Sequence, residues 1–421
     1  MIYLQKKLHM KTRTVTILFF TMLMVLNVCA QNVDRNDIKF DYIQLPAKPF
    51  DKTIKNYQTK SSMAYASDVA NQKMSHDEKI KQSETDYQEE LKNYDVKKKA
   101  AQDRYDAQMV EWNKKKLAER LIMKDKEPKM EYISTPYKKT PVEEKYQKVF
   151  DEGLVASYVK LEGFKNSPDN AVKVNIKLLG FEATDPKVMN REATETNSVK
   201  VMYYWNEIQY KHPIGYKIEL PNGEVIVEDY PKDMAEFSTY KTSESKGSSS
   251  SLSGTSLDVV MQRLQNEIVE KNLKKINELI NNDYGYRKML RETELYMVSS
   301  KANEYPEYKV AYDDALEGYK GMSVEVTKTA SIEKIKRAID SWEKDMKESN
   351  PADKKARIDA DVTLATLFNL VEADSWTGDF SKLDENLSKL NRLDLSKKER
   401  KRYEALQVFV TAQRVRFEAN K

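Results

Sequence analysis

The residue types that most often carry out chemistry are scarce in this chain of 421 residues, which holds one cysteine and three histidines. The cysteine, Cys29, lies in an apolar N-terminal segment, and only His76 and His212 lie beyond that segment. If the segment is removed, the sequence excludes disulfides, thiol catalysis and cysteine-ligated zinc, and it disfavours a multi-histidine metal site. A Ser-His-Asp site needs a single histidine and stays open.

The acidic residues give no clearer indication of a catalytic or metal site than the cysteine and the histidines do. The pair Asp359 and Asp361 falls in a predicted helix, where alternate residues point apart, and Asp313, Asp314 and Glu317 fit a solvated helix face. The chain has no Gly-rich phosphate loop, Gly-x-Ser-x-Gly or His-Glu-x-x-His motif. Two carboxylates suffice for a glycosidase, so a hydrolase remains a minor alternative. We predict no catalytic residue, no cofactor and no bound metal, and therefore a protein that is not an enzyme.

Aromatic residues are the better candidates for contact with a ligand or partner. Tyr203, Tyr204 and Trp205 are consecutive in a predicted strand, where aromatic rings on a sheet surface can stack on sugars. Trp112 and Tyr105 share one face of a predicted helix. Core packing is the alternative for all five.

The N-terminal segment has the layout of a secretory signal peptide. A basic stretch that includes Lys11 and Arg13 precedes the apolar run Thr14–Val28, and Ala30 provides a small residue before Gln31. We predict a cleaved signal at residues 1–30, with export to the periplasm, the outer membrane or the exterior. An uncleaved anchor, a lipid on Cys29 and a true start at Met10 are alternatives.

Removal of that segment changes the charge of the chain. The whole sequence has 71 basic and 67 acidic residues, and the segment holds four basic residues and no acidic one. The remainder is therefore balanced, which gives no long-range attraction for nucleic acid. We expect protein partners in the cell envelope, no nucleic acid and no transmembrane segment after cleavage. The ending Cys-Ala-Gln-Asn resembles signal peptides of Bacteroidota.

A strongly charged region, 54–125, must position the helical aromatic residues. Its second half has apolar residues at steps of three, four or seven, which predicts one helix face. They are Tyr87, Leu91, Tyr94, Ala101, Tyr105, Met109 and Trp112. So long a helix needs a packing partner, and we predict an antiparallel helical hairpin arm over 54–125 after an extended segment at 31–53. The alternative is a single solvated helix or a charged linker.

One short motif occurs on both sides of this arm. Asp41-Tyr42-Ile43-Gln44-Leu45-Pro46 matches Glu131-Tyr132-Ile133-Ser134-Thr135-Pro136 in the pattern acidic-Tyr-Ile-x-x-Pro. The prolines predict an extended chain at the first copy.

The region 126–242 changes to the alternating pattern of strands. A strand is expected to begin near Val155, residues 171–178 alternate strictly, and Asn222-Gly223 predicts a tight hairpin turn. Lys160–Phe164 resembles Lys177–Phe181, which suggests adjacent strands. We predict an antiparallel β-sandwich-like domain at 126–242, a Ser-rich linker at 243–256, and at 257–300 a helix with a possible strand packing on the β domain.

The C-terminal part, 301–421, has helical spacing throughout. Within it, residues 365–394 resemble a degenerate tetratricopeptide repeat. The matching residues are Asn369, Leu370, Ala373, Gly378, Asp379, Phe380, Leu387, Leu390, Leu393 and Asp394. The sequence departs from the family at Val371, Leu383 and Leu395, and Leu390, although it belongs to the leucine-spaced ending, stands where alanine is usual. The resemblance implies stacked antiparallel helices with a protein-binding concave face; an ordinary helical bundle is the alternative.

Together these features predict an α+β protein with a long helical arm, an antiparallel β middle and a helical C-terminal domain. The expected function is that of a non-enzymatic scaffold that binds proteins. A glycan-binding module that uses the aromatic residues of the β domain is the alternative.

Overall fold

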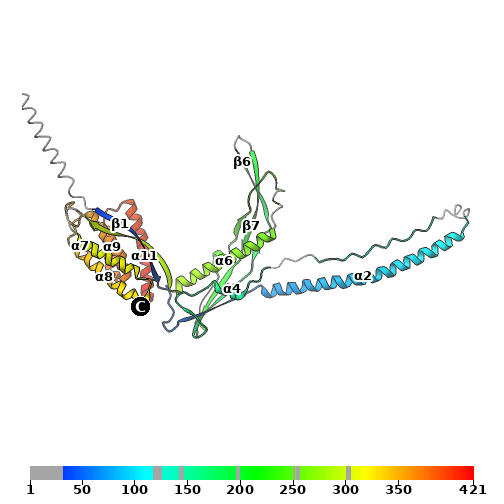
Figure 1. The fold of residues 1–421 in the computed structure, drawn as a ribbon, viewed down its shortest axis with the longest axis horizontal. Helices are drawn as coiled ribbons and strands as arrows, with labels where there is room; N and C mark the ends of the chain where they lie inside the picture. The colour runs from blue at the N-terminus through cyan, green and yellow to red at the C-terminus, as the bar shows by residue number, and fades with distance from the viewer. Residues whose placement is uncertain are drawn as a thin grey trace, which may run out of the picture. The chain divides into compact units, whose positions relative to one another are not determined.

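The computed structural model describes residues 32–116, 126–141, 147–195, 200–249, 252, 257–299 and 305–421. The N-terminal part contains one long helix, antiparallel sheets form the middle, and helices make up the C-terminal part, which confirms the predicted α+β class (Figure 1). The chain divides into two compact units, one of Met1–Gln58, Lys160–Val172 and Lys275–Lys421, the other of Thr59–Val159 and Lys173–Lys274. The predicted signal peptide lies outside the described residues.

The first unit contains a two-stranded ribbon. Strand β1 (Asn32–Gln44) pairs antiparallel with β12 (Arg287–Ser299), so that Phe40 lies opposite Arg291. Alternation along β1 buries Ile38, Phe40 and Tyr42 on one face. The strand expected near 293–298 therefore exists, but its expected packing on the β domain is wrong. It joins β1 because the apolar residues of both strands share one core with the C-terminal helices.

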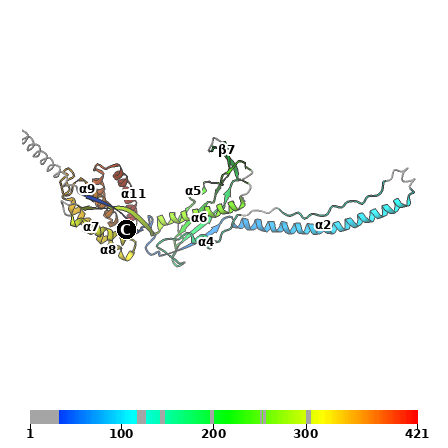
Figure 2. The same ribbon diagram turned by 45° about the horizontal axis from the view of Figure 1, so that its top comes forward.

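Five helices pack beneath this ribbon, and each lies against the next in sequence. They are α7 (Pro306–Lys320), α8 (Glu325–Met346), α9 (Ala360–Thr377), α10 (Phe380–Asn391) and α11 (Lys397–Ala419). Helices α7 and α9 contact both strands of the ribbon. The face that these helices present is thus covered by a segment from the other end of the chain (Figure 2).

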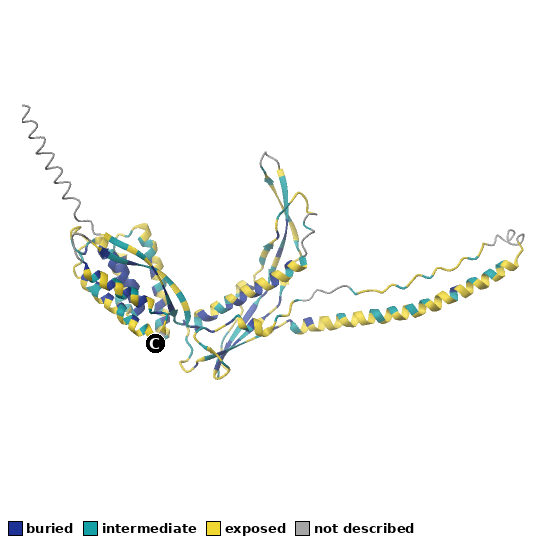
Figure 3. Cartoon of the chain, in the orientation of Figure 1, coloured by how far each residue is buried: buried dark blue, intermediate teal, exposed yellow. Residues whose placement is uncertain are grey.

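Helix α9 lies at the centre of the first unit. Nearly every residue from Val362 to Trp376 is buried, as in a helix packed on all sides (Figure 3). One of its polar side chains is bonded to the ribbon: Asn369 accepts from the Tyr296 amide at 2.9 Å and donates to the Tyr296 carbonyl at 2.8 Å. These bonds fix the position of β12 on α9.

Local signals set the ends of the C-terminal helices. Asp359 caps α9 by accepting a bond from the Val362 amide, and Gly378 ends it with a positive φ of 80°. Asp379 then caps α10 in the same way, through the Lys382 amide. Ser396 and Glu399 form a reciprocal capping box at the start of α11.

The described strands outside the ribbon form two five-stranded sheets. In one, β7 (Lys200–Lys211) is bordered by β5 (Glu182–Ala183), β6 (Lys187–Thr194), β10 (Ser238–Lys241) and β11 (Ser245–Lys246). The other has the order β3 (Lys165–Asn166), β2 (Asn56–Met63), β4 (Ala171–Leu178), β8 (Ile214–Glu219) and β9 (Val225–Asp229). The β8–β9 hairpin turns at Gly223 with φ of 89°, as the Asn-Gly pair predicts.

Three expectations for the middle of the chain are wrong. The strand predicted near Val155 is a short helix, α4 (Glu152–Ser157), capped by Asp151. The segments Lys160–Phe164 and Lys177–Phe181 are not adjacent strands; their likeness reflects the positive-φ glycines Gly163 and Gly180 that each contains. The serine-rich stretch is not wholly a linker, because β11 within it pairs with β7.

Helix α6 (Leu257–Tyr284) covers the β7 sheet with its first turns, where Val260 and Leu264 pack on Ile208. The part of the 257–300 prediction that placed a helix on the β domain thus agrees with the structure. Among the described residues, no helix combines the length and apolar character that crossing a membrane requires.

The arm is built differently from the prediction. Residues 56–63 form β2, and one helix, α2 (Ala66–Lys114), runs for 49 residues. The described part of the return leg, 126–141, is extended and lies along α2, where Arg104 pairs with Glu131 and Lys138 with Glu84. The helical hairpin over 54–125 is therefore wrong. Pro128, Pro136 and Pro141 exclude a regular helix in the return leg.

Candidate binding surfaces

The aromatic cluster of β7 is divided between the two faces of the sheet. Because side chains alternate along a strand, Tyr203 and Trp205 share one face, and Tyr204 lies on the face of Ile208, which packs against α6. Trp205 is buried, whereas Tyr203 and Tyr204 are half-buried. The three residues therefore do not form a single aromatic platform.

Cations cover the shared face of Tyr203 and Trp205. The guanidinium of Arg191 lies 4.8 Å from the Tyr203 ring centre, and Lys241 Nζ lies 3.8 Å from that of Trp205. Glu244 holds both cations, at 2.6 Å from Arg191 Nη2 and 2.8 Å from Lys241 Nζ. Hydrogen bonds from Arg191 and then Lys241 lower the pKa of Glu244 to about 2. A sugar that stacked on these rings would have to displace this network.

His212 is buried among aromatic rings and takes part in packing. Its side chain is fully buried at the corner between β7 and β8, with the rings of Tyr65, Phe150 and Phe181 about it at centroid distances of 6.0, 6.3 and 6.4 Å. Burial lowers the pKa of His212 to about 4, which keeps the ring neutral. Tyr65 directly precedes α2, and Phe150 follows the described return leg in the sequence, so this cluster joins the base of the arm to the corner between β7 and β8.

Tyr105 and Trp112 lie on the predicted stripe of α2, where both are half-buried. Along all of α2, Val69 and Ala101 are the two residues classed as buried. The return leg covers part of the stripe but leaves a hollow of about 330 Å³ that Tyr87 and Tyr137 help to line. The arm thus presents a long aromatic surface that the chain itself covers incompletely.

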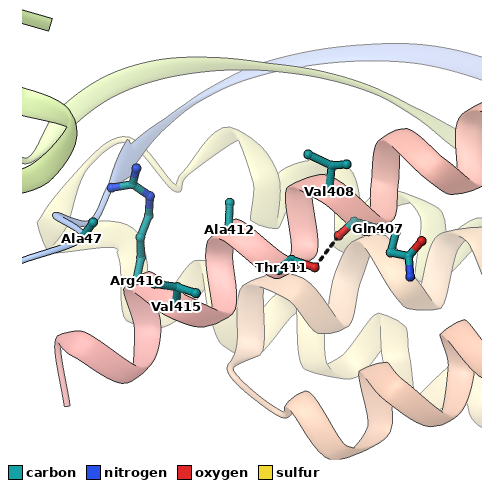
Figure 4. A pocket seen from close by; sticks show the side chains of 7 residues that line it. All are labelled: Ala47, Gln407, Val408, Thr411, Ala412, Val415 and Arg416. Carbon is teal, nitrogen blue, oxygen red and sulfur yellow. Dashed lines mark hydrogen bonds between the residues drawn. The ribbon is translucent and has the colours of Figure 1, made fainter. Parts of the chain in front are cut away.

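A second open surface lies on α11. An apolar groove of about 510 Å³ is lined by Val408, Ala412 and Val415, with Ala47, Gln407, Thr411 and Arg416 around it (Figure 4). Val408 is 73% and Val415 55% exposed. This groove was not predicted, because the opposite stripe of α11, with Leu406 and Val410, accounts for the helix as a core element. The second apolar spacing at 408, 412 and 415 was the available signal.

Within the described residues, no group of three or more histidine, cysteine or acidic side chains is arranged to hold a metal ion. The Gly378-Asp379 corner joins α9 to α10, and α9 is buried along nearly all of its length. No protein-family model and no curated protein matches this chain.

Proposed function

We propose that this chain is an exported, non-enzymatic scaffold protein of the bacterial cell envelope. It binds protein partners through the arm, formed by α2 and its return leg, and through the TPR-like C-terminal region. The signal-peptide pattern at residues 1–30 supports export, and the balanced charge of the remaining chain supports a partner other than nucleic acid.

The observation that carries the proposal is the incomplete burial of α2. A helix of 49 residues is about 70 Å long at about 1.5 Å per residue. Helices in proteins are stabilised mainly by packing of an apolar face, and one extended leg with three prolines covers little of such a face. The half-buried aromatic stripe of α2 is therefore suited to a further partner that completes its packing.

The glycan-binding alternative finds less support. A sugar platform requires open ring faces, and the cations of Arg191 and Lys241 lie over Tyr203 and Trp205. The alternative predicts glycan binding that Trp205→Ala abolishes, and a glycan array of both proteins tests it.

The scaffold function is tested by capture of the tagged full-length protein from cross-linked native cells. The informative variant is Leu91→Asp, which places a charge on the half-buried stripe, and the matched control is Val96→Asp, at a position 68% exposed on another side of α2. We expect the wild type and Val96→Asp to recover the same partner in stoichiometric amount and Leu91→Asp to lose it. No stoichiometric partner, or equal recovery with Leu91→Asp, would contradict the proposal.

A further inference from the structure

The two copies of the acidic-Tyr-Ile-x-x-Pro motif differ in the burial of their tyrosine. In the first copy, at the end of β1, Tyr42 is buried edge-on between Trp376 and Phe409, with ring centres 4.9 and 6.5 Å away. In the second, on the return leg of the arm, Tyr132 is 86% exposed. The helices thus bury the tyrosine of the first copy, whereas the tyrosine of the second copy is exposed.

The first unit shows how this motif is held. Arg416 Nη1 donates to the carbonyl of Leu45 at 2.7 Å, and Asn420 Nδ2 donates to that of Pro46 at 2.8 Å. Both donors lie at the end of α11. Side chains at the end of α11 therefore donate hydrogen bonds to the backbone carbonyl groups of an extended segment, while Tyr42 of that segment packs among aromatic rings.

The open groove on α11 lies next to the site where α11 binds the first copy of the motif. Arg416, which binds Leu45, also lines the groove, and Ala47 follows directly after the motif (Figure 4). The methyl groups of Val408, Ala412 and Val415 form the apolar part, with Gln407 and Thr411 as polar neighbours. A tyrosine suits such a lining because it combines an apolar ring with a polar tip.

We infer that the segment 131–136 on the arm of one copy docks in the α11 groove of a second copy of this chain. The return leg is already extended, so little ordering is needed on binding. Tyr132 lies over Val408 and Val415, and the segment runs beside the chain's own copy of the motif. This inference rests on the proposed scaffold function and adds self-association to it.

The test uses purified full-length protein with the photo-reactive residue p-benzoylphenylalanine in place of Tyr132. Isotopically light and heavy chains are mixed, irradiated and digested, so that mass spectrometry separates cross-links between copies from those within one chain. We expect cross-links between copies that join residue 132 to residues 407–416. Cross-links confined to one chain, or directed elsewhere on the second copy, would overturn the inference.

Matched variants make the test specific. Val408→Asp, and Ala412→Trp as a second variant that fills the groove, should each weaken self-association in sedimentation equilibrium by about tenfold or more. Val326→Asp, at a position 92% exposed on α8, should leave it unchanged. Unaltered association with both groove variants, or a wild type that stays monomeric at high concentration, would refute the docking. If the captured envelope partner is still recovered by Val408→Asp, the scaffold function stands independently of this result.

Discussion

Glu372 and Asp374 are two residues apart on α9, and both carboxyl groups are buried. Burial acts to raise the pKa of Glu372, but Arg291, at 2.6 Å, together with Thr293 and Trp376, holds it below its usual value. Asp374 receives one bond, from Asn386 at 2.8 Å, and burial raises its pKa to about 7. The two residues differ because only Glu372 has a cation within hydrogen-bonding distance.

Because the carboxyl group of Asp374 is buried, we expect the free energy of unfolding to depend on pH. Its pKa in the folded chain lies above the ordinary value of 3.8, so the stabilising protonated form is lost as pH rises from there through about 7. Asp374→Asn should raise the free energy of unfolding at pH 8 by an amount on the order of 2–4 kcal/mol and change it little at pH 4.

Chemical denaturation of the first unit, followed by circular dichroism at pH 4 and pH 8, measures this effect. Asp340→Asn, on the exposed face of α8, is the control and should give no such difference. An Asp374→Asn variant with unchanged stability at pH 8 would show that the carboxyl group is not held in a desolvated site.

At the scale of elements, the turn between α9 and α10 depends on one glycine. Gly378 has φ of 80°, and a Cβ there would lie 3.0 Å from Phe417 Cε1. Gly378→Ala should destabilise the first unit by about 1–2 kcal/mol, because an L side chain disfavours this backbone region. Gly378→Asn keeps the Cβ but tolerates the left-handed conformation better, so it should cost less. Thermal unfolding compares the two, and an equal loss would assign the effect to the Phe417 contact instead.

Some elements followed from local signals in the sequence. Helical spacing marked the C-terminal helices, Asn222-Gly223 marked the β8–β9 turn, and strict alternation marked β4. Pairing of β1 with β12 did not follow, because about 250 residues separate the strands and neither carries a sign of its partner. The ribbon forms because both strands bury apolar residues on the same helices.

The arm shows why the candidate surfaces were only partly predictable. The spacing of Tyr87, Tyr105 and Trp112 correctly placed them on one helix face, but it could not identify what covers that face. The hairpin hypothesis overlooked that prolines occupy the return leg. On β7, alternation predicted that Tyr203 and Trp205 share a face, whereas the cations above them come from other strands and had no local signal.

At the scale of the whole molecule, burial is unevenly distributed. Helix α9 is buried along nearly all of its length, and α2, more than twice as long, has two buried residues. A helix with so few buried contacts opens readily, because local stability follows local packing. In the proposed scaffold, partner binding supplies the contacts that α2 lacks.

Hydrogen exchange of the full-length protein tests this claim most directly, with the free chain and the captured complex measured under the same conditions. The account predicts fast exchange of the α2 amides in the free chain, exchange in α9 slower by orders of magnitude, and a marked gain of protection in α2 in the complex. Protection of α2 equal to that of α9 in the free chain, or no change of α2 in the complex, would contradict the account.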